Sequence, residues 1–311
     1  SPDDQSSTGV RLYGMSPADR ITGLLSDLAD ALHDRAVSGR DVVMPGYTHL
    51  QQAQPLRAAQ WALSHLFPVL RDIERMKAAR DAAAVLPLGS GAIAGCPFPI
   101  DRESIRAELG FDRVSENSVD SVSDREWICD FVYAGAMIGV HLSRLSEDLV
   151  LFSSVEFGFV RLSDGFSTGS SLMPQKRNPD VAELGRGKAG RLIRNLMSML
   201  TLLTGLPTSY NRDLQEDKEA LFDASDTVQL CLAVFTRMIP SIAIQRDAMA
   251  QATAEGFMEA TDLADYLVEK GVAFRDAHNH AGRLVALAAV DSKTCGLAWT
   301  PAGRFKHPRE S

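Results

Sequence analysis

Residues 168–180 read TGSSLMPQKRNPD, a stretch that combines loop chemistry with a helix start. Gly169 and Pro174 argue against regular structure, whereas Asn178 followed by Pro179 is typical of an N-cap with proline at the first helical position. The stretch is therefore predicted to be a loop that leads into a helix. Its hydroxyls, amide and cations in front of a helix N-terminus suit an anion, including one that forms during a reaction.

The bulk properties limit what the chain can be. Its 311 residues are 45% hydrophobic and 23% charged, as in a globular chain long enough for one large or two ordinary domains. The net charge of −8 argues against nucleic acid and anionic membranes as partners. We expect no bilayer-spanning run and no secretory leader, and the expected location is the cytoplasm.

The cysteines and histidines lack the spacing of a metal site. The four cysteines contain no C-x-x-C pair, and no two histidines have zinc-binding spacing. We therefore predict no metal site, and we predict that the cysteines are reduced and mostly packed. These residues are Cys96, Cys129, Cys231 and Cys295.

Apolar residues recur at helical spacing in several long segments, and sustained period-two alternation is absent. The first long helix is predicted to begin at Ser16-Pro17 and to end before Gly39. The other predicted helices are Leu56–Ala84, Arg102–Leu109, Asp124–Phe152, a run from Pro179 to Gly205, and a run from near Asp213 to Pro240. Residues 44–51 and the glycine-rich residues 86–95 are predicted to be loops.

These long helices have apolar residues on more than one face. A single chain of this size cannot bury all of those faces, so we expect the helices to pack against partner copies. The predicted fold is an all-α bundle of long helices, with a central domain at 1–250 and a small α-helical domain at 251–311.

Three clusters carry polar groups suited to chemistry. His49 lies in a loop and can exchange a proton near neutral pH, although a lone histidine there is more often capping or solvated. Glu183 could orient a histidine brought from elsewhere, although an acid in a first helical turn is also simply favourable. The run YNRDLQEDKE at 210–219 would ordinarily be a solvated helix start.

Two long motifs carry a resemblance to a known family. Residues 169–179, GSSLMPQKRNP, resemble the signature of the fumarase/aspartase superfamily. Residues 207–220, PTSYNRDLQEDKEA, are similar to its argininosuccinate lyase branch, as are residues 45–51, 86–95 and 260–268. The resemblance covers nearly the whole chain, and only residues 299–311 match weakly.

The resemblance implies a reaction, an assembly and a set of site residues. The reaction is the reversible, cofactor-free splitting of argininosuccinate into arginine and fumarate, in a homotetramer whose sites combine motifs from different subunits. The catalytic positions are His49, Ser170, Lys176 and Glu183. The substrate-contact positions are Thr48, Ser171, Asn178, Tyr210, Gln215 and Lys218. Ser170 and His49 carry out the two proton transfers, and which of them is the base and which is the acid stays open.

The chain also departs from the family pattern. Pro2 and Asp3 stand where that pattern has an arginine and an asparagine that hold the fumarate half of the substrate. Residues 14–17 are expected to interrupt a helix that runs unbroken in the family. The preceding domain and part of the last one are missing from the match. Two alternatives therefore stay open, an inactive structural homologue such as a lens crystallin, and a sister lyase that releases fumarate from another N-substituted aspartate.

Overall fold

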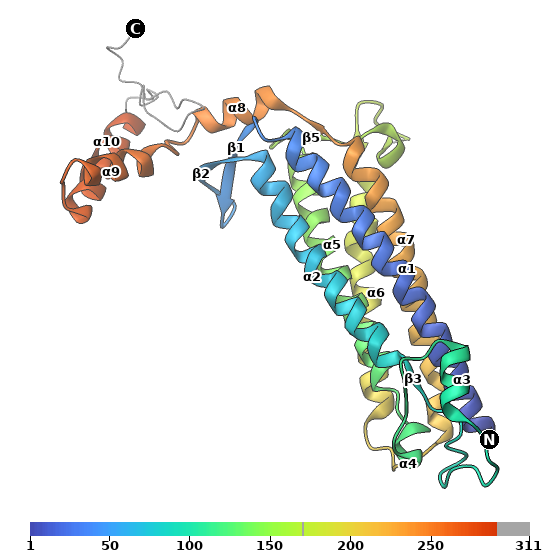
Figure 1. Ribbon diagram of the computed structural model, residues 1–311. Helices are drawn as coiled ribbons and strands as arrows, with labels where there is room; N and C mark the ends of the chain where they lie inside the picture. The colour runs from blue at the N-terminus through green and yellow to red at the C-terminus, as the bar shows by residue number, and fades with distance from the viewer. Residues whose placement is uncertain (170, 291–311) are drawn as a thin grey trace. The chain divides into compact units, whose positions relative to one another are not determined.

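The computed structural model describes residues 1–169 and 171–290, so Ser170, Cys295 and the weakly matched tail lie outside the described residues. Long α-helices dominate the chain (Figure 1), and the predicted all-α fold is confirmed. The helices are α1 (Pro2–Ser38), α2 (Ala58–Ala83), α3 (Arg102–Leu109), α4 (Ser118–Ser121), α5 (Glu126–Phe152), α6 (Asp180–Leu203), α7 (Asp217–Ser241), α8 (Arg246–Ala254), α9 (Ala260–Glu269) and α10 (Phe274–Val290), with 3₁₀ turns η1 (Asp164–Phe166) and η2 (Arg212–Glu216).

The strands are short and pair only two by two in the described residues. They are β1 (Val43–Thr48), β2 (Gln51–Arg57), β3 (Val85–Leu86), β4 (Arg113–Val114), β5 (Val160–Arg161), β6 (Thr168–Gly169), β7 (Arg177–Asn178) and β8 (Ala243–Ile244). The pairs are β1 with β2, β3 with β4, β5 with β8, and β6 with β7.

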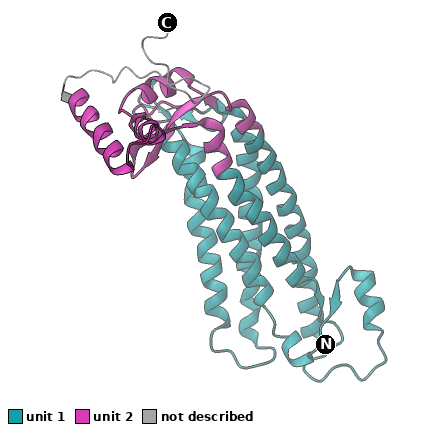
Figure 2. Cartoon of the chain, turned by 60° about the vertical axis from the view of Figure 1, so that its left-hand side comes forward, with its two compact units in different colours: residues 1–33, 65–151, 162–242 teal, residues 34–64, 152–161, 243–311 magenta. Residues whose placement is uncertain are grey.

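The chain divides into two compact units (Figure 2). Unit 1 comprises residues 1–33, 65–151 and 162–242, and unit 2 comprises residues 34–64, 152–161 and 243–311. Both units are discontinuous in sequence. The predicted domains, 1–250 and 251–311, stay a prediction.

Helix α5 forms the centre of unit 1, because it contacts each of the other long helices there. Its Trp127 packs so closely on α1 that a Cβ at Gly14 would lie 2.3 Å from the indole Cζ3. Gly139 lets α6 approach closely as well, since a Cβ there would lie 2.8 Å from Leu192 Cδ1. Gly135 faces Val228 of α7. The helix spacing therefore depends on small residues at these crossings.

Two histidine–aspartate pairs join α5 to α2. The Nε2 atom of His65 lies 2.8 Å from Asp148 Oδ2, and the Nδ1 atom of His141 lies 2.6 Å from Asp72 Oδ2. The pairs are two helical turns apart on each helix, with histidine and aspartate exchanged between the helices. Asp72 is fully buried and also accepts a hydrogen bond from Arg75. The polar side chains on this side of the core therefore have hydrogen-bond partners.

The predicted break at Ser16-Pro17 is wrong, because α1 runs from Pro2 to Ser38 with Pro17 inside it. Proline removes one backbone hydrogen bond, which normally ends or kinks a helix. Here tertiary packing outweighs that loss, since the next residue, Ala18, and Ile21 are completely buried. The predicted end before Gly39 is confirmed.

The remaining helix predictions hold with small changes. Helix α3 has the predicted bounds, because the Asp101 side chain caps its start and Gly110, with φ of 77°, ends it. The helix expected from near Asp213 begins at Asp217 and is preceded by η2. Residues 44–51, expected to be a loop, instead belong to the β1–β2 hairpin.

Helix α5 also corrects the expectation that no segment is long and apolar enough to span a bilayer. By length and composition α5 passes that test. Yet 56% of its most apolar window is buried inside the structure, and its contacts in unit 1 are those of a central core helix. The apolar composition of α5 is therefore explained by the bundle.

Unit 2 is built around the β1–β2 hairpin. Tyr47 near the hairpin tip belongs to a cluster of aromatic rings, with centroid distances of 5.3 Å to Phe157 and 6.2 Å to Phe159. Trp61 and Phe152 complete the cluster at 5.7 Å from each other. The Gln52 side chain donates to the carbonyl of Ala252 in α8. The hairpin is thus held from both of its strands.

Candidate active site

The loop at 170–176 is closed at its base by a pair of very short strands. Thr168 pairs with Asn178 and Gly169 with Arg177, in antiparallel register. The Thr168 hydroxyl donates to the carboxylate of Asp180, the first residue of α6. The two ends of the loop are therefore held together.

The predicted cap of the following helix is wrong in detail. Helix α6 begins at Asp180, and Pro179, not Asn178, takes the cap position, without a side-chain cap. Pairing with Thr168 draws Asn178 into the strand, which removes it from the helix start. Ser171 and Lys176 are exposed in the loop, and Glu183 is exposed in the first turn of α6. Ser170 lies outside the described residues.

A second group of candidate residues follows the end of α6. Tyr210 precedes η2, Gln215 lies within it and Lys218 lies in the first turn of α7. The Lys218 ammonium donates to Asp217 Oδ1 at 2.8 Å, and the other carboxylate oxygen accepts from Arg125 Nε at 2.7 Å. Asp217 therefore bridges the two cations.

This bridge belongs to a buried polar network. Asp217 and Arg125 are almost completely buried, and Arg125 also donates to the carbonyls of Val122 and Asp124. Asp124 in turn accepts from Arg11, which is buried on α1. Breaking such a buried pair on one side is costly, so the network fixes the start of α7 against α1 and α5.

A cavity of about 460 Å³ opens beside this network. Its lining includes Asp124, Arg125, Ser209 and Leu214, so it borders the segment that carries Tyr210. Asp130 lines it as well; its side chain is exposed, yet partial desolvation by its surroundings and the neighbouring Asp124 raise the pKa of its carboxyl. The cavity is thus polar.

Arg125 and Asp217 are functional candidates that sequence reasoning missed. Asp217 stands inside the charge-rich run at 210–219, where its charge pattern looks solvated. Arg125 lies 92 positions away in sequence, so no local pattern connects the two residues. Only the folded arrangement reveals that Lys218 rests on a buried pair.

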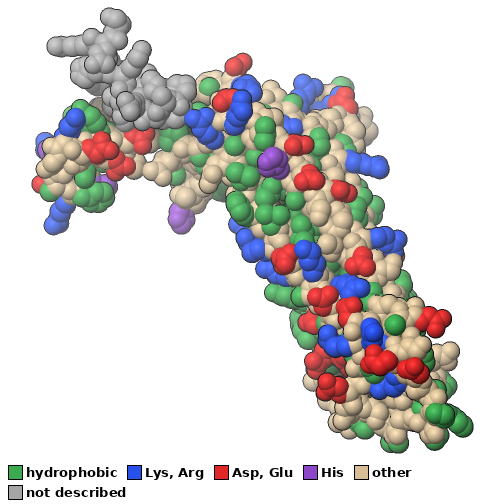
Figure 3. All heavy atoms as spheres, viewed as in Figure 1, with side chains coloured by type: hydrophobic (Ala, Val, Ile, Leu, Met, Phe, Trp, Pro, Cys, Tyr) green, Lys and Arg blue, Asp and Glu red, His purple; other side chains and the backbone are tan. Residues whose placement is uncertain are grey.

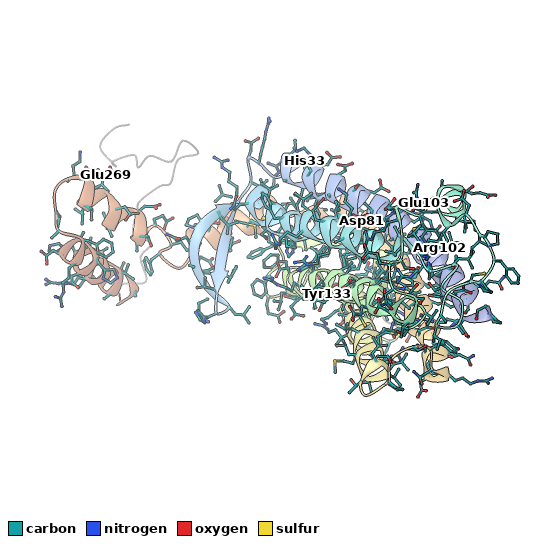
Figure 4. All side chains as sticks on the ribbon, turned by 60° about the horizontal axis from the view of Figure 1, so that its bottom comes forward. His33, Asp81, Arg102, Glu103, Tyr133 and Glu269 are labelled. Atoms are coloured by element: carbon teal, nitrogen blue, oxygen red, sulfur yellow. The ribbon has the colours of Figure 1, made fainter. Side chains whose placement is uncertain are left out.

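The glycine-rich residues 86–95 are also held in place by distant side chains. Asp4 in the first turn of α1 accepts hydrogen bonds from the backbone N–H groups of Gly89 and Gly91, at 3.0 and 2.9 Å. Arg102, at the start of α3 (Figure 4), donates to the carbonyls of Leu86 and Leu88. Because this turn is tied on both sides, it presents a defined backbone at the N-terminal end of α1.

The loop residues and the Lys218 group are not brought together within unit 1. Glu183 lies at the start of α6, whereas Tyr210 follows its end. From Glu183 to Leu203 the helix advances by about 30 Å. One copy of unit 1 therefore cannot supply both groups to the same small substrate.

Thr48 and His49 belong to unit 2, at the tip of the β1–β2 hairpin. Both side chains are exposed. His49 and the following Leu50 each have φ of 56°, a conformation that L-residues adopt at a cost. The candidate proton donor or acceptor is thus displayed on a tight turn.

No metal site emerges in the described part of the chain, since no three His, Cys, Asp or Glu side chains gather there. The candidate residues instead offer hydroxyls, amides, ammonium groups and an imidazole. Such groups stabilise developing negative charge and transfer protons.

Comparisons with known proteins identify the family. The family described as "Lyase" matches residues 1–193, and that described as "Argininosuccinate lyase C-terminal" matches residues 257–306. An argininosuccinate lyase of Pelotomaculum thermopropionicum is 53% identical over 285 residues, and one of Roseiflexus castenholzii is 52% identical over 285 residues. The chain belongs to the argininosuccinate lyase branch of the fumarase/aspartase superfamily.

The match spans 92% of this chain but 62% of each of those two relatives. The chain thus spans less than two thirds of the length of these members of the lyase family.

Solved structures of the superfamily share the fold. An EDDS lyase in complex with formate superposes with a TM-score of 0.88 at 26% identity, over 94% of this chain and 59% of that chain. The class II fumarase of Schistosoma mansoni gives a TM-score of 0.84 at 17% identity, over 95% of this chain and 65% of the fumarase. The second similarity concerns the fold alone.

Proposed function

We propose that this chain carries the catalytic core of an argininosuccinate lyase, a carbon–nitrogen lyase that reversibly splits argininosuccinate into arginine and fumarate. The observation that carries the proposal is the identity of 53% over 285 residues with a named argininosuccinate lyase. The polar residues of the signature loop support it, because their chemistry suits the anion that this elimination forms.

The proposed elimination removes a proton next to a carboxylate. The electron pair left on carbon moves onto that carboxylate, and the resulting intermediate carries two negative charges on it. The ammonium of Lys176, the amide of Asn178 and the backbone N–H groups near Ser171 are the donors proposed to stabilise this charge. The carbon–nitrogen bond then breaks, which yields the fumarate double bond.

Two proton transfers complete the proposed reaction. Ser170 takes the proton from carbon, its alkoxide being stabilised by the loop amides and a nearby cation, and His49 gives a proton to the departing guanidinium nitrogen. Glu183 holds the imidazole of His49 in the required orientation. The reverse assignment of Ser170 and His49 is the alternative, and no metal or other cofactor takes part in either.

The remaining candidate residues are proposed to bind the substrate. Thr48 and Ser171 supply hydroxyls, and Tyr210, Gln215 and Lys218 contact the carboxylates and polar ends. Lys218 is well suited to this, because the buried Asp217–Arg125 pair fixes the position of its ammonium.

The loop at 170–176 is proposed to close over the substrate. Its base is tied by the β6–β7 pair, whereas Leu172 in the loop is 83% exposed. An apolar residue displayed in this way becomes buried when the loop closes, and closure excludes water from the intermediate.

A homotetramer is the proposed assembly, with each site shared between subunits. The separation of about 30 Å between Glu183 and the end of α6 supports sharing, since small-molecule contacts span much less. Exposed apolar residues lie among charged ones along the long helices (Figure 3), and partner copies would cover them. They include Phe67 on α2, Tyr133 on α5 (Figure 4), Leu184 on α6 and Leu230 on α7.

The cytoplasm is the proposed location, and the proposed partners are the small-molecule substrate and identical subunits. The net charge of −8 supports the proposed partners, because nucleic acid and anionic membranes repel a negatively charged protein.

Two other functions remain as candidates. Pro2 and Asp3 favour an inactive structural homologue, because a carboxylate at Asp3 repels a dianionic substrate. A sister lyase would keep the fumarate chemistry but accept a different N-substituted aspartate. The 26% identity with an EDDS lyase is the observation that keeps this candidate open.

The test is release of fumarate, followed by ultraviolet absorbance after argininosuccinate is added to the purified protein. We expect fumarate from the wild type and none from Ser170→Ala. If other N-substituted aspartates release fumarate and argininosuccinate does not, the sister-lyase function replaces the proposal. A folded wild type that releases fumarate from none of them supports the structural function.

A further inference from the structure

The base of the β1–β2 hairpin is held by contacts on both of its strands. Tyr47 and Gln52 face each other across the two strands. Tyr47 is packed among aromatic rings, and Gln52 donates to the Ala252 carbonyl at 3.1 Å. Gly256 allows this close approach, because a Cβ there would lie 2.2 Å from Gln52 Oε1. Only residues 48–51 extend beyond the fixed base.

The turn itself uses two residues that are poorly suited to it. Thr48 pairs with Gln51, so His49 and Leu50 are the two turn residues, both with φ of 56°. A two-residue hairpin turn with both φ values positive is of the I′ type, which favours Asn followed by Gly. Leucine rarely adopts this conformation, so the turn is strained at Leu50.

Packing inside unit 2 does not explain the choice of leucine. The Leu50 side chain is 63% exposed, and the neighbouring Thr48 and His49 are exposed as well. Glycine or asparagine at position 50 would fit the backbone better and would lose little buried area. Backbone strain that no stabilising contact offsets is typical of functional positions.

We propose that Leu50 is a positioning residue for His49. Its Cβ, which glycine lacks, confines the turn to a narrower range of backbone angles, and these angles set the direction of the His49 imidazole. A glycine at position 50 would relax the turn and let the imidazole sample more directions. This inference rests on the proposed function, in which His49 transfers a proton, and it adds a residue that touches neither substrate nor product.

The test compares Leu50→Gly and Leu50→Asn with the wild-type protein. Both substitutions fit a positive φ, but asparagine keeps a Cβ and so loosens the turn less. We expect both to raise Tm, and we expect Leu50→Gly to lower kcat about tenfold with little change in KM, with Leu50→Asn in between. Gly23→Ala, at an exposed position of α1 with open space around it, is the control for a gain in stability alone.

A second readout does not need activity. The ring-proton NMR signal of His49, assigned with His49→Asn, should be broadened or shifted in Leu50→Gly relative to the wild type. If the wild type releases no fumarate, the proposed function fails while this signal still decides the inference. An unchanged signal, a wild-type kcat in Leu50→Gly, or a loss of Tm that marks Leu50 as a packed residue would each overturn it.

Discussion

Single glycines control how closely the helices of unit 1 approach. Gly14→Ala should lower the free energy of unfolding by about 1–3 kcal/mol, because the new methyl group would lie 2.3 Å from Trp127. Gly23→Ala on the same helix should raise it by up to about 1 kcal/mol, since nothing lies within 4 Å and alanine favours helix. Urea denaturation measures both, and equal effects at the two positions would contradict the close α1–α5 contact.

Individual cysteine thiols should differ in reactivity. Burial, with the nearby Asp130, raises the pKa of Cys129 to about 11, whereas Cys96 is exposed. Since the thiolate is the reactive form, iodoacetamide at mildly alkaline pH should label Cys96 quickly and Cys129 slowly. Peptide mass spectrometry of the native protein measures the two rates, with denatured protein as the control. Equal native rates would show that the fold does not shield the half-buried Cys129 on α5.

Residue patterns predicted some local features correctly and missed others for physical reasons. Asp101 and Gly110 carry the cap signals of α3, and its bounds follow from them. Pro17 carries a break signal that the burial of Ala18 and Ile21 overrides. A prediction from local sequence therefore holds where local interactions determine the ends of a helix. It fails where tertiary packing determines them.

Helices α6 and α7 are joined by a charged cluster that makes stability depend on pH. A hydrogen bond from Arg191, aided by one from Asn195, lowers the pKa of Asp223 from 3.8 to about 2. A lowered pKa means that the contribution is complete above the ordinary value and is lost as pH falls toward 2. Asp223→Asn should therefore cost about 1–2 kcal/mol at neutral pH and less below about pH 4.

Thermal unfolding of wild type and Asp223→Asn across pH measures this contribution. The gap in Tm should be constant near neutral pH and should narrow as the wild-type carboxylate becomes protonated. A gap that stays the same down to the acid limit would mean that Asp223 acts through packing rather than charge.

The two histidine–aspartate pairs between α2 and α5 should differ in strength. Asp72 is buried and binds both Arg75 and His141, whereas the Asp148 side chain is 35% exposed. Asp72→Asn should cost about 2–3 kcal/mol and Asp148→Asn less than about 1 kcal/mol. Urea titration compares the two variants, which are matched in chemistry. Similar losses would show that burial does not set the strength of these pairs.

Among the secondary-structure elements, the β1–β2 hairpin is one that the hydrophobic periodicity of the sequence does not predict. Residues 43–57 contain Pro45, Gly46 and Pro55, which signal a loop. They nevertheless form paired strands, with an irregular register between Pro45 and Tyr47 that accommodates the prolines. The candidate His49 was found from sequence, but its strained turn was not, because backbone angles leave no residue signature here.

Within unit 1, Glu183 lies at the start of α6 and Lys218 lies beyond its end, in the first turn of α7. Sequence identified the motifs at 168–183 and 210–218, since both are local. Their separation along α6 follows from the fold. In the proposed assembly, contacts between copies would bring them together, and no local pattern specifies such contacts. The central claim for the whole molecule is therefore the proposed sharing of each site between copies.

The most direct measurement of that claim mixes two inactive variants. Glu183→Gln and Lys218→Met, each with a different affinity tag, are unfolded together, refolded, and assayed for fumarate release from argininosuccinate. If each site takes Glu183 from one copy and Lys218 from another, about a quarter of the sites in mixed oligomers regain both residues, and activity returns. Mixed oligomers, verified by both tags, that stay as inactive as the separate variants would contradict a site shared between copies.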